Sequence, residues 1–413
     1  MPKQTQPAQS SRFSAAARVI LIFGLISMLG DVVYETARSA NSQYLNLLDI
    51  SAAQVGLVFG IGEFLGYCLR LLSGVLSDRS GKHWTFMFIG YGMLFAVPLM
   101  GFTRRWPLLV ILILMERIGK AIRNPAKDTI LSSVANNQLG IGMAFGIQEA
   151  LDQLGAFAGP LIFTAVFALS GKQGLDEYQL GYRLLIIPFV LLMLFLIFAQ
   201  HRIERDQLIP EMQVKDYHQE KLPKIFWLYT LFTFFCTLGF TNFSTLGYHL
   251  KAQELLSDSQ ITLLYSIAMA IDALAALAVG KAYDALKKKT GQKTAGILVL
   301  ALIPFLTLAL PMLGLTTSIP LIVLGMILFG LIMGTHETIM RSAIADITPY
   351  YKRGTGYGVF NTTYGLALFC GAALMGLLYN ADRIDLIIYL SLAAEIVAVG
   401  FFMAIRKEIR SRA

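Results

Sequence analysis

GVLSDRSGKHW, residues 74–84, is a short charged turn between two long apolar segments. A second stretch with the same spacing of glycine and aspartate, GKAYD at residues 280–284, also follows a long apolar segment. Apolar runs that end in short charged turns are typical of helices that cross a bilayer and return. The two stretches therefore indicate a membrane protein in which one part of the chain repeats another.

The composition agrees with this interpretation. Of 413 residues, 56% are hydrophobic and 15% are charged, which is unusual for a soluble domain. A helix that spans a bilayer needs about 20 predominantly apolar residues. Twelve segments meet this need, and they begin near residues 17, 52, 84, 107, 142, 180, 224, 260, 294, 318, 354 and 384. We therefore predict an all-α membrane protein with twelve transmembrane helices.

Two further pairs of motifs support a repeat of six helices. RNPAKD, residues 123–128, follows the fourth apolar segment, and RSAIAD, residues 341–346, follows the tenth. The fifth and eleventh segments each contain two glycines that are 13 residues apart, Gly146 with Gly159 and Gly358 with Gly371. Matches at corresponding positions in both halves predict two six-helix pseudo-repeats.

The distribution of charge predicts the topology. The two tails and the even-numbered connections carry most of the 34 Lys and Arg residues, and such connections are cytoplasmic as a rule. The net charge of +8 is thus a topology signal, and no nucleic-acid partner is expected. We predict a multi-pass protein of the bacterial inner (plasma) membrane with both termini cytoplasmic. Its expected parts are an N-terminal tail (1–16), a six-helix bundle (17–200), a cytoplasmic linker loop (201–223), a second six-helix bundle (224–405) and a basic tail (406–413).

The turn after the second segment resembles the signature of the major facilitator superfamily, G-x-x-x-D-R-x-G-R/K. Gly74, Asp78, Arg79, Gly81 and Lys82 occupy its positions. The resemblance implies the major facilitator fold and a secondary transporter, with a substrate site near the midplane between two halves that rock.

The fifth segment is similar to the antiporter motif of the same family, because Gly146, Gly155, Gly159 and Pro160 have its spacing. The glycine pair that the motif places just beyond is replaced by Phe163-Thr164. This departure weakens the inference that the protein is an antiporter.

Charged residues near the cytoplasmic helix ends are predicted to form a gate between the halves. Such pairs break and re-form as halves rock, and glycine permits tight turns. The predicted gate residues are Gly74, Asp78, Arg79, Gly81, Lys82, Arg123, Asp128, Arg341 and Asp346.

Charged residues inside the apolar segments are candidates for proton coupling or substrate binding. A charge at the bilayer centre costs about 2.5–3.5 kcal/mol on insertion scales, so such residues are rare without a function. The candidates are Asp31, Glu35, Glu63, Glu116, Arg117, Glu149, Asp152 and Glu337. Asp31 is favoured because related transporters often carry a coupling acid in the first helix. Arg38 is expected to pair with Glu35 at i+3, and Arg117 either pairs with Glu116 or opposes a positive charge at the proton site.

Aromatic and amide side chains within the segments are expected to line the substrate cavity. They are Tyr34, Tyr67, Phe234, Phe240, Asn242, His336, Asn361 and Tyr364. Aromatic walls with a few carboxylates suit lipophilic cations through cation–π attraction.

We therefore predict a proton-coupled secondary transporter, working by alternating access, that exports a small amphiphilic or cationic compound. Proton-coupled import of a nutrient, metabolite or metal chelate is the alternative. A ligand-binding sensor and coupling by sodium also remain open. The sequence contains no P-loop pattern and no metal-ligand set, so we expect no cofactor, no metal and no enzymatic activity. The expected partners are the lipid bilayer, a small-molecule substrate and protons, and the chain is expected to be a monomer.

Overall fold

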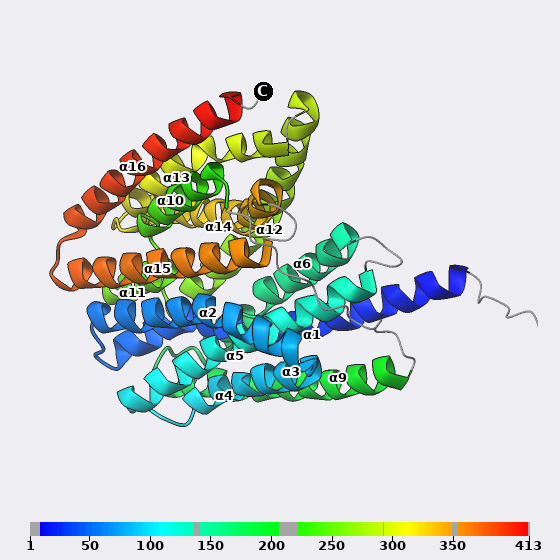
Figure 1. Ribbon diagram of the computed structural model, residues 1–413. Helices are drawn as coiled ribbons and strands as arrows, with labels where there is room; N and C mark the ends of the chain where they lie inside the picture. The colour runs from blue at the N-terminus through cyan, green and yellow to red at the C-terminus, as the bar shows by residue number, and fades with distance from the viewer. Residues whose placement is uncertain (1–8, 136–140, 206–221, 292, 349–352, 412–413) are drawn as a thin grey trace, which may run out of the picture.

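The computed structural model describes residues 9–135, 141–205, 222–291, 293–348 and 353–411. All regular elements within these ranges are helices, and they lie side by side in one elongated bundle (Figure 1). The predicted all-α fold is confirmed.

Ten helical pieces precede the linker. They are α1 (Gln9–Leu47), α2 (Ala52–Ser80), α3 (His83–Gly92), η1 (Met93–Phe95), α4 (Ala96–Met100), α5 (Trp106–Ala135), α6 (Ile141–Ala158), α7 (Leu161–Ser170), α8 (Leu175–Leu184) and α9 (Ile186–Arg205). The third, fifth and sixth predicted segments are each divided into consecutive pieces. In the fifth, the break between α6 and α7 coincides with Pro160, whose ring prevents a regular helical hydrogen bond.

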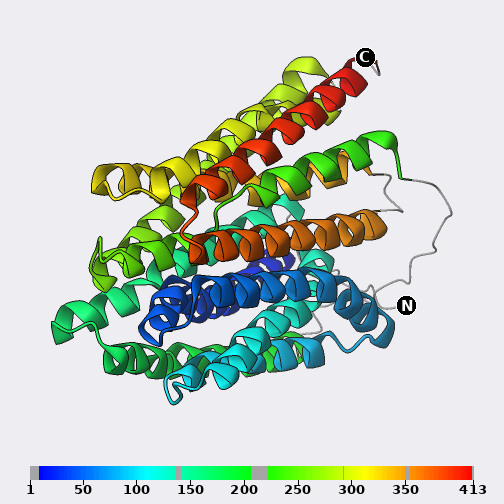
Figure 2. The same ribbon diagram turned by 90° about the vertical axis from the view of Figure 1, so that its left-hand side faces the viewer.

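Eight pieces follow the linker. They are α10 (Lys224–Leu238), α11 (Phe243–Ala252), α12 (Asp258–Thr290), η2 (Lys293–Leu302), α13 (Ile303–Gly314), α14 (Ile319–Ile347), α15 (Arg353–Asn380) and α16 (Ile384–Ser411). The described ends of α1 and α16, with the start of α10, lie at one end of the bundle, called the terminal end here (Figures 1 and 2). The connections 48–51, 101–105, 171–174, 253–257, 315–318 and 381–383 form the opposite, distal end.

Eleven helical stretches of the described chain are long and apolar enough to cross a membrane. The fourth predicted segment, α5, is not among them because Glu116, Arg117, Lys120 and Arg123 interrupt its apolar character. This helix nevertheless packs along α2 and α3 inside the bundle. Together with α5, these stretches match the twelve predicted helices, and the charges on α5 are shielded from lipid by the helices around it.

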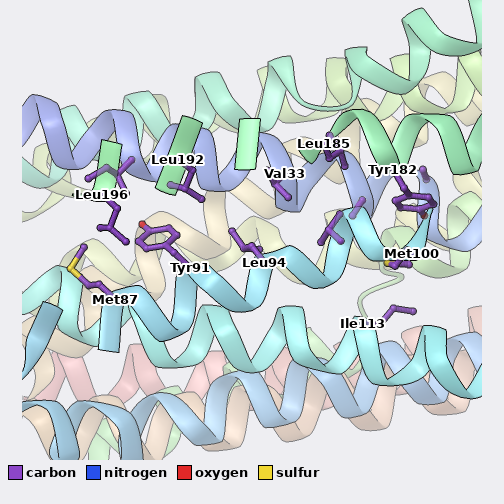
Figure 3. Packing of buried hydrophobic residues seen from close by; sticks show 14 of the residues in the cluster. Val33, Met87, Tyr91, Leu94, Met100, Ile113, Tyr182, Leu185, Leu192 and Leu196 are labelled. Atoms are coloured by element: carbon purple, nitrogen blue, oxygen red, sulfur yellow. The ribbon is translucent and has the colours of Figure 1, made fainter. Parts of the chain in front are cut away.

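The first half packs around a core of its own. Met87 and Tyr91 of α3 face Leu192 and Leu196 of α9 across this core (Figure 3). A separate cluster, with Tyr229 and Phe360 stacked 5.7 Å apart, joins α10 to α15 in the second half. Since lipid is as apolar as these side chains, close packing stabilises such contacts in a membrane.

Within each half, a glycine allows two helices to pack closely, and the two pairs of helices are equivalent. A Cβ added at Gly159 would lie 2.7 Å from the carbonyl oxygen of Val32 on α1. A Cβ at Gly371, the predicted counterpart of Gly159, would lie 2.8 Å from the carbonyl oxygen of Leu238 on α10. The fifth predicted segment, which contains α6, therefore packs on α1 as α15 packs on α10. The pseudo-repeat is visible in this packing.

The halves bond to each other at the distal end. The Tyr248 hydroxyl donates to the carbonyl oxygen of Ile50 at 3.0 Å, and the Asp258 amide donates to Oε1 of Gln173 at 3.0 Å. Deeper along α12, the Ser266 hydroxyl donates to the carbonyl oxygen of Phe157. Glycines Gly56 and Gly376 allow α2 and α15 to approach closely at the same end. These contacts close the distal end of the space between the halves.

We expect Gly155→Ala to destabilise the first half, because its Cβ would lie 2.4 Å from the carbonyl oxygen of Met28 and force α1 and α6 apart. Overpacking of this kind costs about 1–3 kcal/mol. Thermal unfolding of the purified chain in detergent measures the effect. Gly400→Ala is the control, since nothing lies within 4 Å of a Cβ there. Equal melting temperatures for both variants would contradict the packing.

Candidate functional site

A cavity of about 160 Å³ lies between the halves. One water needs about 10–15 Å³ of such space, so this is a ligand-sized chamber and not a packing defect. It extends from Ser42 towards Arg70, Asn124 and Tyr357, which lie nearer the terminal end of their helices. We call it the substrate cavity.

Six of the residues that the sequence predicted for the cavity wall line this chamber: Tyr34, Tyr67, Asn242, His336, Asn361 and Tyr364. Phe240 lines it too, as predicted, whereas Phe234 is not among the lining residues. Tyr67 and Tyr364 meet edge-on across the halves, with ring centroids 4.9 Å apart. Their contact with substrate stays a prediction, but the structure brings all six together.

A break in the seventh helix shapes one wall. The chain leaves the helical path between α10 and α11, and this break presents Phe240 and Asn242 to the cavity. Asn242 caps α11 by accepting from the amide of Thr245 at 3.2 Å, as Asn does at helix starts. The Ser391 hydroxyl of α16 donates to the carbonyl oxygen of Gly239 at 2.8 Å. The backbone at the break is thereby anchored from outside the cavity.

Arg117 is held by acids and a tyrosine of the first half. Its Nη1 donates to Glu63 Oε1 at 2.7 Å and also to the Tyr34 hydroxyl. Its Nε lies 3.5 Å from Glu116 Oε2. Glu116 and Arg117 are buried, so this is a paired charge cluster within one half. Of the two alternatives for Arg117, the geometry fits the pair, with Glu63 nearer than Glu116.

A second, smaller chamber of about 90 Å³ adjoins the substrate cavity. It shares Arg38, Lys120, Asn124, Met333 and Glu337 with that cavity. Its acids outnumber its bases, six to four, and we call it the acidic chamber. The acids are Asp31, Glu35, Asp128, Asp152, Asp272 and Glu337, and the bases are Arg38, Lys120, Arg123 and Lys127.

Within the acidic chamber, Lys127 has polar partners, whereas Asp31 has none among the described residues. The Lys127 ammonium donates to the Ser27 hydroxyl at 2.7 Å and lies 3.9 Å from Asp152 Oδ2. Asp31 makes no hydrogen bond or ion pair with the described part of the chain. A carboxyl group placed in this way is open to exchange a proton with water in the chamber.

Glu35 joins the two halves. Its Oε2 accepts a hydrogen bond of 2.6 Å from the Tyr265 hydroxyl of α12, and its Oε1 lies 3.5 Å from Arg38 Nη1. The predicted Arg38–Glu35 pair is thus present. Glu35 is buried, so these two partners hold its carboxylate in place.

The predicted gate residues occupy several kinds of position. Gly81 ends α2 with a φ of +65°, where glycine avoids strain, and Lys82 follows it on the exposed turn. Arg123 is buried with its guanidinium 4.7 Å from the Tyr91 ring centroid. Asp346 accepts from Tyr283 at 2.8 Å and from Lys287 at 2.6 Å.

These contacts of Arg123 and Asp346 stay within one half, while Asp128 lines the acidic chamber and Gly74 packs beside Pro125. Five predicted site residues have side-chain positions outside the described part of the chain: Asp78, Arg79, Gly146, Glu149 and Arg341. The gate therefore stays a prediction.

The sequence did not predict Tyr265, which bonds Glu35, or three bases that line the chambers, Arg70, Lys120 and Lys127. Arg70, Lys120 and Lys127 are charges on membrane helices, and the same cost argument that selected Glu63 would have found them. Tyr265 had no sequence signal, because a buried tyrosine is common and its bond to Glu35 joins distant helices. Within the described residues, no group of three or more His, Cys, Asp or Glu residues is arranged to hold a metal.

Comparisons with known proteins agree with the fold. The family model described as Major Facilitator Superfamily matches residues 13–372 and 245–411. An uncharacterised protein of Mycobacterium tuberculosis is 35% identical over 408 residues, which cover 97% of this chain and 95% of the relative. An uncharacterised MFS-type transporter of Methanocaldococcus jannaschii is 27% identical over 367 residues, covering 87% and 88% of the two chains. A bacterial homologue of the human lysosomal transporter Spinster, in an inward-facing and unoccupied conformation, has a TM-score of 0.69 at 15% identity and covers 95% of this chain and 97% of its own.

We expect Arg117→Met to destabilise the first half by about 3–5 kcal/mol, because it leaves Glu63 and Glu116 without their cation. Thermal unfolding in detergent measures the loss. The triple variant Arg117→Met, Glu63→Gln, Glu116→Gln removes the uncompensated charges and should recover part of the stability. A single variant as stable as wild type would show that the cluster contributes nothing to folding.

Proposed function

Because the chain belongs to the major facilitator superfamily, we propose that it is a proton-coupled secondary active transporter that moves a small molecule by alternating access. The substrate cavity between the halves supports this proposal. With the distal end closed by contacts between the halves and the cavity extending towards the terminal end, the conformation corresponds to one state of such a cycle. If both termini are cytoplasmic, as the charge distribution predicts, this state faces the cytoplasm.

The observation that carries the coupling proposal is the Glu35–Tyr265 hydrogen bond across the halves, beside the unpaired carboxylate of Asp31. A protonated Glu35 loses the charge that Arg38 and the Tyr265 hydroxyl stabilise, so proton binding in the acidic chamber weakens a contact that joins the halves. We propose that Asp31 exchanges the proton with water and that Glu35 conveys its arrival to the second half. Protons are therefore the proposed coupling ion.

Export of a small amphiphilic compound is the proposed direction, on the partial antiporter motif of the fifth helix. Proton-coupled import of a nutrient, metabolite or metal chelate is the alternative, because the same carboxylates serve a symporter. A cationic substrate, which the sequence favoured, has less support. The surplus of acids that suggested it belongs to the acidic chamber, whereas bases outnumber acids around the substrate cavity.

We expect Asp31→Asn to separate coupling from transport. Transport is measured in proteoliposomes. The test compound is chosen beforehand by a screen for compounds that raise the melting temperature of the purified chain. The variant should lose accumulation driven by a pH gradient and keep exchange of labelled for unlabelled compound, because exchange needs no net proton movement. Asp176→Asn, at an exposed distal position paired with Arg104, is the matched control. Gradient-driven accumulation that survives in Asp31→Asn would exclude Asp31 as the coupling acid.

We expect Tyr265→Phe to shift the protein towards a state with an open distal end, because the variant lacks the hydroxyl that Glu35 accepts. Spin labels at Lys172→Cys and Arg383→Cys, on distal connections of the two halves, report the opening in a background without the native cysteines. Double electron–electron resonance should show a larger population at long distance in Tyr265→Phe. The same experiment with Tyr182→Phe, whose hydroxyl bonds Asn41 within the first half, is the control. An unchanged distance distribution would refute the role of this bond.

A further inference from the structure

The charges around the substrate cavity are unevenly compensated. Four bases and two acids line it. Arg117 is paired with Glu63 and Glu116, and Arg38 lies beside Glu35. The other two bases, Arg70 and Lys120, have no carboxylate oxygen within 4.0 Å among the described residues. The cavity thus contains two cations without an acidic partner in a membrane interior, where an unpaired charge is costly.

Tyrosine rings hold both cations in place. The Arg70 guanidinium carbon lies 4.5 Å from the Tyr67 ring centroid, and the Lys120 ammonium lies 3.6 Å from the Tyr34 ring centroid. Cation–π attraction orients a cation without satisfying its hydrogen-bond donors. Accordingly, the buried Nε of Arg70 has no hydrogen-bond partner among the described residues. Donors of this kind are available to a ligand.

Arg70 and Lys120 stand on neighbouring helices of the first half, α2 and α5, which pack along each other. Asn124 follows Lys120 by four residues, shares its helix face and lines the same cavity. A guanidinium, an ammonium and an amide therefore surround one region of the first half. Arginine and lysine with a neutral donor form a site for a carboxylate or similar oxyanion.

The wall contributed by the second half is different in character. Phe240, Phe243 and Phe360 form an apolar part of it with Leu368, and the polar residues Asn242, His336, Glu337 and Asn361 also line it. An apolar ligand body gains contact area against the phenylalanines. A molecule that places its charged group on the first half and its apolar body on the second would contact both halves at once.

We propose that the substrate of this site is an organic anion, with an oxyanion group bound by Arg70 and Lys120 and an apolar or aromatic body packed against the phenylalanines of the second half. This inference rests on the proposed transport function and specifies the substrate class of the same cavity. A cation would approach two like charges that have no carboxylate oxygen within 4.0 Å among the described residues, and repulsion of this kind discriminates against wrong ligands. Binding an anion removes the cost of the unpaired bases, so the site selects for negative charge.

Three matched probes test the charge preference: 2-naphthoate, 2-naphthylmethylammonium and 2-naphthylmethanol. Isothermal titration calorimetry on the full chain in nanodiscs at pH 7.5 gives the dissociation constants, with empty nanodiscs as the correction for lipid partitioning. We expect 2-naphthoate to bind more tightly than the other two by roughly tenfold or more, since hydrogen bonds to charged groups are the stronger ones.

Variants locate the binding. Arg70→Gln and Lys120→Met should each weaken 2-naphthoate by roughly tenfold to a hundredfold, and Arg70→Lys should weaken it less because the charge remains. Arg105→Gln, at an exposed distal position, should bind as wild type does. Melting temperatures within a few degrees of wild type establish that each variant is folded. If Arg70→Gln does not fold, Arg70→Lys replaces it in the comparison.

Tighter binding of the ammonium probe, 2-naphthoate affinity that is unchanged in both Arg70→Gln and Lys120→Met, or binding of none of the three would each overturn the organic-anion proposal. The transport proposal is judged separately by the Asp31→Asn exchange experiment. If a cationic or neutral compound shows gradient-driven transport that depends on Asp31, the transport function stands and only the substrate class is wrong. If no compound that stabilises the chain is ever exchanged, the transport function itself fails.

Discussion

A charged side chain in the middle of a bilayer must be paired or must face water, and most of this structure follows from that constraint. α5 carries a glutamate, an arginine and a lysine within five residues, Glu116 to Lys120, so these charges cannot face lipid. It is enclosed by neighbouring helices, and its charged face turns towards the space between the halves. The Arg117 cluster neutralises part of this charge within the first half. The remaining charges line the two chambers, so the interior of the bundle is a suitable place for a polar path.

Close packing of helix backbones within each half, together with the contacts between the halves, then determines which end of that path is closed. Gly159 against α1 and Gly371 against α10 make equivalent contacts in the two halves, so each half is a compact unit. Between the halves, the described hydrogen bonds gather at the distal end, and one of the deeper ones joins Tyr265 to Glu35. The halves are thus joined where the acidic chamber begins. A change of charge at that position acts on a contact between two compact units, which is the requirement for alternating access.

The two chambers separate two kinds of chemistry. Acids predominate in the chamber that contains Asp31, and bases predominate in the one lined by the aromatic residues. Arg38 and Lys120 line both, so in the proposed cycle a ligand and a proton share the same cations without sharing a site. Coupling between two sites needs only that each alters the free energy of the other, and two shared cations supply a direct electrostatic route for it.

The sequence alone determined the helical membrane fold, the two pseudo-repeats and several residues of the cavity wall, because apolar length, charge cost and motif spacing are local properties of the chain. It also predicted the Arg38–Glu35 pair, whose partners lie one helical turn apart. The sequence did not reveal that Glu63 is nearer to Arg117 than Glu116 is, that Tyr265 bonds Glu35, or that acids and bases separate into two chambers. Each of these depends on which helix faces which, and residues far apart in the chain meet only through tertiary packing. The tertiary structure therefore decided the charge of the substrate cavity, which is the sum over several helices and is not visible in any one of them.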